Sequence, residues 1–373
     1  MTSKNILVIF TFAFLLGLIL VAVRQQQASK VTVWDVSTEW AFSAHADRTA
    51  EAFVHWDEDD PPLVPVNCAM CHSYYGFADF LGADGSASGV VDADARIGSV
   101  LFCATCHNQV SPEYRTVEFP SGDQIVAQGF EAMCMTCHHG RESTVRLNEV
   151  TAGQPVDTPI EGQGFINPHY FVASATQAGG EARGGYQYDG RTYVPRFTHT
   201  ETMDTCIECH NPHSLEIDPQ TCSPCHANVV DGADFGGVRQ SALDHDGDGD
   251  TAEGILSEIE ALSARLYDAI RDYAASVLGT PIAYHPDTYP YYFVDGNDNG
   301  MADEDEANFG NRYVLWSPRL LRAAYNYQFV QKDPGGFVHG PHYQLQLLYD
   351  SLDDLGERVS VAMAGLARPS AAE

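Results

Sequence analysis

The chain of 373 residues carries 51 acidic and 20 basic side chains, so its formal net charge at pH 7 is −31. A surface of this sign repels the phosphate backbone of nucleic acids, which excludes a nucleic-acid-binding function, and it favours basic partner surfaces or metal cations. With 44% hydrophobic and 11% aromatic residues, the sequence is globular in composition and suits one large domain or two closely packed ones.

The N-terminal segment differs from the rest of the sequence. Residues 6–23 form an uncharged apolar run between Lys4 and Arg24. The run is longer than the ~7–15 residues usual in a signal peptide and close to the ~20 that span a bilayer. Residues 1–30 are therefore predicted to be a signal peptide or an N-terminal membrane anchor. Both alternatives export the rest of the chain to the periplasm or the cell surface.

All ten cysteines belong to one motif, Cys-x-x-Cys-His, which occurs five times. The five copies are Cys68, Cys71 and His72; Cys103, Cys106 and His107; Cys134, Cys137 and His138; Cys206, Cys209 and His210; and Cys222, Cys225 and His226. This motif attaches c-type haem: the thiols form thioether bonds to the vinyl groups, and the histidine becomes the proximal iron ligand. Structural zinc is the alternative, but paired Cys-x-x-Cys knuckles do not require histidine at the same offset each time. We therefore predict five covalently bound haem c groups in a pentahaem region, residues 31–239.

Ten of the fifteen histidines lie outside the motifs, enough to give every iron a second axial histidine. An iron capped on both sides carries electrons and leaves no open position for a substrate. His213 is the best candidate for a distal ligand, because it lies three residues after His210 and shortly before the fifth motif. The other preferred distal ligands are His45, His169, His199 and His339. A second tier comprises His55, His139 and His342, together with His245 and His285.

The expected fold class is mainly α and coil: a haem-stacked region with little regular secondary structure, followed by a helical segment. Glycine-rich runs at residues 82–89 and 179–185 predict loops, and Asp189-Gly190 predicts a β-hairpin turn. In the segment 240–373, apolar residues at helical spacing predict a long amphipathic helix over residues 255–277. Further helices are predicted from Ser317-Pro318 to about residue 330 and over residues 342–355.

Two acidic loops in the helical segment resemble EF-hand calcium loops, and we expect them to pack with it on the haem region. In residues 295–306, the oxygen ligands would be Asp295, Asn297, Asn299, Asp303 and Glu306, with the carbonyl of Met301. A weaker site begins with Asp244, Asp246, Asp248 and Asp250, but its twelfth position is Ile255. The alternative is a solvated acidic turn. If calcium binds, the abundance of extracellular calcium favours a structural role.

Several segments resemble exported multihaem c-type cytochromes of respiring bacteria. They are the surroundings of His45, the third motif through Arg141, the fourth motif through His213, and residues 320–339. The resemblance covers nearly all of residues 40–355 and implies electron transport along haems to redox partner proteins or extracellular acceptors, in anaerobic or extracellular respiration. It also implies distal ligands at the five preferred positions above. Nothing in the sequence demonstrates an oligomer or a filament.

The competing hypothesis is an enzyme, a pentahaem reductase of nitrite or hydroxylamine with one open catalytic haem. That family usually attaches its catalytic haem through Cys-x-x-Cys-Lys, which this sequence does not contain. We therefore assign no catalytic residue and predict an electron-transfer protein.

Overall fold

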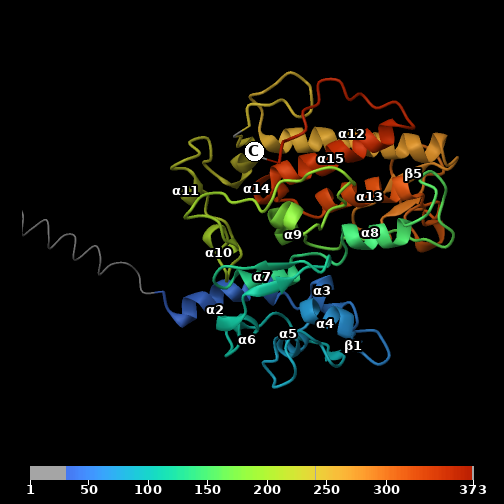
Figure 1. Cartoon of the computed structure of the whole chain (residues 1–373). Helices are drawn as coiled ribbons and strands as arrows, with labels where there is room; N and C mark the ends of the chain where they lie inside the picture. Colours follow the sequence, from blue (N-terminus) through green and yellow to red (C-terminus); the bar gives the residue numbers. More distant parts are fainter. Residues whose placement is uncertain (1–30, 240, 372–373) are drawn as a thin grey trace, which may run out of the picture.

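The structure, a computed structural model, describes residues 31–239 and 241–371. Up to residue 239 the helices are short and separated by long coil segments (Figure 1). They are α2 (Val33–Ala41), α3 (Glu51–Val54), α4 (Val66–His72), α5 (Tyr74–Leu81), α6 (Cys103–Cys106), α7 (Glu131–Cys137), α8 (Thr144–Thr151), α9 (Ala173–Ala178), α10 (Cys206–Cys209) and α11 (Pro219–Cys222). The predicted class, mainly α and coil, is confirmed.

The C-terminal part contains the longest helices, as predicted. They are α12 (Ile255–Ser276), α13 (Pro318–Gln331) and α15 (Pro341–Gly356), and the short α14 (Gly336–His339) lies between the last two. Helix α13 begins as the sequence indicates, because the Ser317 hydroxyl accepts a hydrogen bond from the Leu320 amide and Pro318 occupies the first turn. Figure 1 shows α12, α13 and α15 grouped on one side of the molecule.

The described strands form three antiparallel pairs. They are β1 (Leu63–Val64) with β2 (Ala95–Arg96), β3 (Thr116–Glu118) with β4 (Gln124–Val126), and β5 (Ile282–Tyr284) with β6 (Tyr292–Val294). In the second pair Val117 lies opposite Ile125, and both side chains are buried. The sequence analysis missed all three pairs, whose strands are only two or three residues long.

The prediction of a β-hairpin at Asp189-Gly190 was right for the turn and wrong for the two flanking strands. The turn forms, since the Arg191 amide donates to the Tyr188 carbonyl, but no strand ladder follows it in the described residues. The flanking amides instead donate to side chains of neighbouring helices. Tyr186 donates to Asn326 at 2.6 Å, and Val194 donates to Gln346 at 2.9 Å. These helix side chains replace the opposite strand as hydrogen-bond acceptors, so the segment stays irregular.

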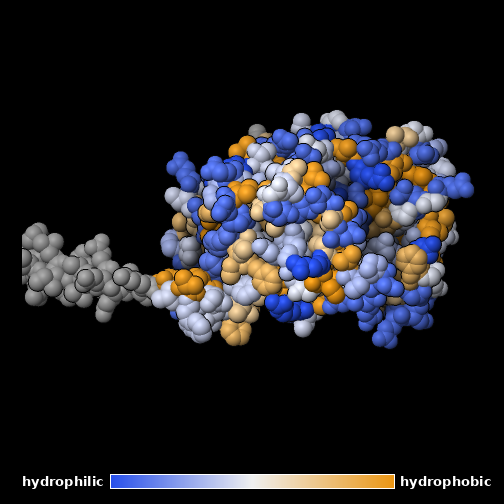
Figure 2. Space-filling model, turned by 90° about the horizontal axis from the view of Figure 1, so that it is seen from below, coloured by the Kyte–Doolittle hydropathy of each residue, from blue (hydrophilic) through white to orange (hydrophobic). Residues whose placement is uncertain are grey.

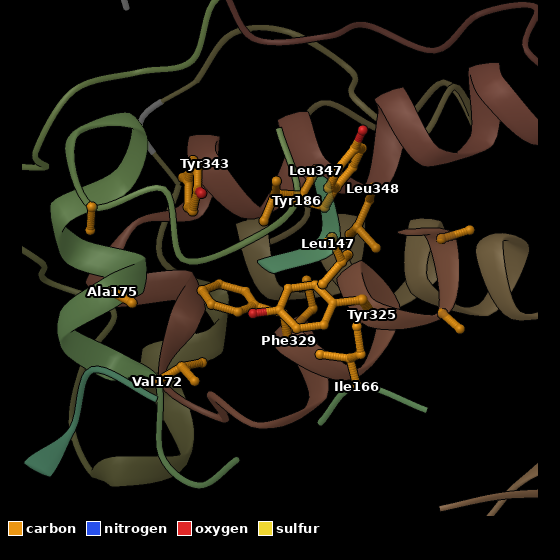
Figure 3. Packing of buried hydrophobic residues seen from close by; sticks show 14 of the residues in the cluster. Leu147, Ile166, Val172, Ala175, Tyr186, Tyr325, Phe329, Tyr343, Leu347 and Leu348 are labelled. Atoms are coloured by element: carbon orange, nitrogen blue, oxygen red, sulfur yellow. The ribbon is translucent and has the colours of Figure 1, made fainter. Parts of the chain in front are cut away.

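One hydrophobic core connects the haem-motif region with the C-terminal helices. It contains Met135 of α7, Leu147 of α8 and Leu266 of α12, each fully buried. In Figure 3, Leu147 lies close to Tyr325 and Phe329 of α13. The predicted boundary near residue 239 stays a prediction, because the same core continues across it.

The face seen in Figure 2 is mostly hydrophilic, with scattered apolar patches. Val33, Trp34 and Phe42, in and next to α2, are among the exposed large hydrophobic residues of the described chain. Within residues 31–239 and 241–371, no helix is long and apolar enough to cross a membrane. The predicted signal peptide or anchor, residues 1–30, lies outside the described residues.

Candidate haem-binding sites

Each Cys-x-x-Cys-His motif is associated with one short helix. The first motif lies within α4. Both cysteines of the second, third and fourth motifs lie in α6, α7 and α10, respectively. Helix α11 ends at Cys222, the first cysteine of the fifth motif. In a helical turn, residues three apart share one face. The two thiols of a motif therefore lie side by side, with the histidine next to them at the helix end, which is the arrangement that one attached haem requires.

Every motif histidine faces a second histidine, and we number the resulting sites by motif. The distances between ring centroids are 5.8 Å for His72 and His169 (site 1), 6.1 Å for His107 and His213 (site 2), 6.4 Å for His138 and His45 (site 3), 6.3 Å for His210 and His339 (site 4), and 5.8 Å for His226 and His199 (site 5). The structure thus pairs each motif histidine with one member of the preferred distal set.

These spacings can be compared with what one metal between two imidazoles requires. A bond from a metal to an imidazole nitrogen is about 2 Å long, so two such bonds plus the ring radii separate the centroids by about 6 Å. Ordinary contacts between aromatic rings span ~4.5–7 Å, a range that includes these distances. His245 and His342, which belong to no motif, also lie 5.9 Å apart. The distances are therefore compatible with two ligands on one iron, and what fits the group is that each of the five motif histidines has one such partner.

Two of the second histidines are held by the same local turn. His169 and His213 both follow the dipeptide Asn-Pro, and their amides donate to the side-chain oxygens of Asn167 at 2.9 Å and Asn211 at 2.8 Å. Such a turn directs the histidine away from the preceding chain. His169 also adopts a φ of 76°, which is uncommon for a residue other than glycine.

Hydrogen bonds at Nδ1 orient several of the rings. His72 Nδ1 lies 2.8 Å from the Ala52 carbonyl, and His210 Nδ1 lies 3.2 Å from the Leu215 carbonyl. His339 Nδ1 lies 2.8 Å from a carboxylate oxygen of the buried Asp333. A donating Nδ1 fixes the ring orientation and leaves Nε2 for a metal. The sequence did not predict this role of Asp333, which lies six residues before His339. The only signal for it was an acidic residue near a candidate iron ligand.

Burial and nearby charges shift the pKa of several of these rings. Burial, with the nearby His45 and His339, lowers the pKa of His138 to about 4. Burial and the nearby His72 lower the pKa of His169 to about 4. Burial opposes protonation of His339 too, but the Asp333 carboxylate outweighs it and raises the pKa of His339. A low pKa keeps an imidazole neutral, the form that binds a metal.

The second-tier histidines have other surroundings. In the described residues, none of them makes a ring contact with a motif histidine. His55 is exposed and pairs with Glu51, His139 bonds to the Gly140 carbonyl, and His245 uses both ring nitrogens, on the Ala367 carbonyl and the Ser241 hydroxyl. His342 lies 5.9 Å from His245, and His285 accepts a bond from the Asp287 amide.

The loop of residues 295–306 is folded around its first residue. Asp295 is buried, and its carboxylate accepts hydrogen bonds from the amides of Asn299 at 3.2 Å and Gly300 at 2.8 Å. Glu306 closes the loop by accepting from the Gly296 amide, and Asp303 accepts from the side chains of Asn297 and Asn299. Met301 donates its amide to Asn299, which leaves its carbonyl available as a ligand. Calcium binding here stays a prediction.

The second acidic loop gathers more carboxylates than its sequence pattern suggested. Asp244 and Asp246 come within 4.8 Å of Glu258, and Asp246 and Asp248 come equally close to Glu253. Glu258 lies in the first turn of α12, beyond the loop, and pairs with Arg239. The sequence analysis missed Glu258 because it lies three residues beyond the expected twelfth position. The Asp250 carboxylate accepts a hydrogen bond from the Ala252 amide, and Asp250 belongs to neither carboxylate cluster in the described residues.

Two comparisons with known proteins identified no match: no family model matches the sequence, and no solved structure is similar to it. The comparison with curated proteins did find relatives. The chain is similar to C-type polyheme cytochromes. It is 26% identical over 415 residues to OmcB of Geobacter sulfurreducens, an alignment that covers 85% of this chain and 51% of the relative. It is also 26% identical over 379 residues to OmcC of the same organism, covering 82% of this chain and 45% of the relative.

The chain thus spans about half the length of the curated relatives it matches. The printed names of these relatives, C-type polyheme cytochromes, agree with the five Cys-x-x-Cys-His motifs of this chain.

Proposed function

We propose that the protein is an exported pentahaem electron carrier in which every iron is held by two histidines. It would pass electrons to redox partner proteins or to extracellular acceptors, in anaerobic or extracellular respiration. The observation that carries the proposal is the pairing of all five motif histidines with a second histidine at 5.8–6.4 Å. The distal ligands would be His169, His213, His45, His339 and His199 for sites 1 to 5, respectively.

In each site haem c would supply an iron that changes oxidation state by one electron. The cysteines of the chain would hold the haem, and the two histidines would hold its iron, which would leave no position for a substrate. Buried partners such as Asp333 hold the rings in place during the change of charge. A rigid site of this kind favours rapid electron exchange and gives no means of bond chemistry.

The haem count is the first expected result. The mass of the intact holoprotein should exceed the mass of its polypeptide by five haems, and a pyridine haemochrome assay should give the same number. The reason is that each of the five motifs has both thiols and a histidine in place. Four haems or fewer, or stoichiometric zinc, would contradict the proposal.

The competing reductase of nitrite or hydroxylamine needs one iron with an open position. Because each motif histidine faces a second histidine, we expect the reduced protein to show no saturable turnover of nitrite or hydroxylamine in stopped-flow measurements. Soluble ferric chelates should still oxidise it, and they provide the positive control. Saturation kinetics with nitrite would instead identify an open catalytic haem.

We also propose that residues 295–306 bind calcium and brace the helical segment. Asp295, Asp303 and Glu306 lie in one loop, and a divalent cation would offset their mutual repulsion. A ligand that binds only the folded state raises the free energy of unfolding, so EDTA should lower the melting temperature and added calcium should restore it. Asp295→Asn should abolish this response. An unchanged melting temperature, with no calcium in elemental analysis, would leave an acidic turn.

A further inference from the structure

Contacts between the motifs in the described residues show which haem-binding sites are neighbours in space. Site 3 adjoins site 1, since the Cys71 sulfur of site 1 lies 3.8 Å from the Thr136 carbonyl. Thr136 belongs to the third motif helix, α7. The attachment point of one haem would therefore lie against the helix that carries the next.

Site 3 adjoins site 4 through the helices that carry their cysteines, since α7 packs against α10. Next to these helices, the side chain of Gln128 donates to that of Asp204 at 3.3 Å. Figure 1 shows α7 between α10 on one side and α4 and α6 on the other.

Site 2 also adjoins site 3, but through other groups. Its His107 ring lies 6.3 Å from the ring of Phe130, the residue that precedes α7. The Leu101 amide, two residues before the second motif, donates at 3.2 Å to the carbonyl of His45, the partner of His138. Cys103 and Cys106 of site 2 are exposed, so this site lies at the surface.

Site 5 connects to the others through site 4. The chain between the fourth and fifth motifs folds back on itself, because His210 and Ile217 form a β-bridge. Val230, four residues after His226, is 78% exposed, which places this end of the series near the surface.

We infer that site 3 is the junction of the electron path: electrons that enter at site 5 pass through sites 4 and 3 to reach site 1, and site 2 is a side branch. This inference rests on the proposed bis-histidine electron carrier. Transfer between haems falls steeply with distance, and Cys71 of site 1 has its sulfur, a haem-attachment atom, 3.8 Å from the backbone of the third motif helix. Each transfer moves one electron from a reduced iron, which becomes oxidised, to an oxidised iron, which becomes reduced, with no bond made or broken.

The experiment follows one electron across the holoprotein. A ruthenium photosensitiser is coupled to Val230→Cys, four residues after His226 and 78% exposed, and a sacrificial donor regenerates it. His169→Met in the same chain marks site 1, because methionine ligation changes the absorbance and raises the potential of that haem. Light then injects an electron at site 5, and its arrival at site 1 is timed.

Three further changes separate the path from the branch. His45→Ala at site 3 alters the axial ligation on the path, and it should slow arrival at site 1 at least tenfold, the factor that ~59 mV gives for a one-electron couple. His339→Ala at site 4 should slow it similarly. His213→Ala, the matched change at site 2, should alter the rate less than twofold. In each variant a high-spin EPR signal reports that the haem is retained and its iron opened.

The outcomes separate the inference from the function on which it rests. The junction is overturned if His213→Ala slows arrival as much as His45→Ala, or if neither His45→Ala nor His339→Ala slows it. If no electron reaches site 1 in the chain that carries only the sensitiser and the marker, the electron-carrier proposal itself fails. Should His45→Ala lose its haem, His45→Met and His213→Met replace the two alanine variants, because methionine changes the axial ligand and keeps the iron capped.

Discussion

Replacing His169 with alanine should convert one of the five irons from six-coordinate low spin to high spin. The His169 ring faces His72 at 5.8 Å, and its Asn-Pro-His turn holds it there. Alanine removes the axial nitrogen and leaves the proximal histidine in place, so that iron gains an open position. EPR of the oxidised protein should show one new high-spin signal, and the reduced protein should bind one equivalent of carbon monoxide.

His55→Ala is the matched control, because it removes a histidine near the same site. His55 is exposed, pairs with Glu51 at 2.7 Å, and is separated from His72 by contacts of both rings with Trp56. We expect all five irons to stay low spin in this variant. A high-spin iron in His55→Ala, with none in His169→Ala, would reverse the roles of the two histidines and remove His169 from the distal set.

The helical turns at the motifs and the second turn that holds two of the histidines have local signals in the sequence. The Cys-x-x-Cys-His spacing fits one helical turn, and Asn-Pro-His is a complete turn in itself. The pairing could not be predicted in this way. His45 faces His138, although His72 is the motif histidine nearest to it in the sequence. His339 faces His210, from which it is separated in the sequence by most of the C-terminal segment. Such pairs depend on how distant segments pack, which no local pattern contains.

The same distinction explains the errors in secondary structure. The long helices of the C-terminal segment were predicted because their apolar residues recur at helical spacing over several turns. The segment around Asp189-Gly190 has the local signal of a hairpin, but its amides bond to Asn326 and Gln346, which come from distant helices. The partners Asp333 and Glu258 were missed for the related reason that a carboxylate's role is set by what it faces.

Loss of Arg319 should destabilise the C-terminal helical segment more than any exposed charge change. Arg319 lies in the first turn of α13, and only 4% of its side chain is exposed. It pairs with Asp157 at 2.8 Å, with Glu357 at 2.8 Å and with Asp354. These carboxylates come from the loop after α8 and from the C-terminal end of α15, so one guanidinium joins three segments. Burial already raises the pKa of the Asp354 carboxyl to about 6 despite Arg319.

Arg319→Gln would remove the cation that pairs with the partly buried Asp354, and it would leave Asp157 with Arg358 alone. Removing one partner of a buried ion pair typically costs about 3–5 kcal/mol, whereas an exposed pair contributes about 0–1 kcal/mol. Arg146→Gln is therefore the matched control, since Arg146 and Glu149 are 51% and 61% exposed. Guanidinium unfolding followed by circular dichroism should give a midpoint clearly lower for Arg319→Gln and nearly unchanged for Arg146→Gln.

The loss should also appear at site 4, which gives the prediction a second readout. After α13 ends at Gln331, the chain continues through Asp333 to α14, where the His339 ring lies 6.3 Å from the His210 ring. When the helical segment unfolds, His339 leaves with it, and the iron of site 4 should become high spin at the same denaturant concentration. In Arg319→Gln that spin change should move to lower denaturant together with the helix signal. Equal midpoints for the two arginine variants would mean that this buried network contributes no more than a surface pair.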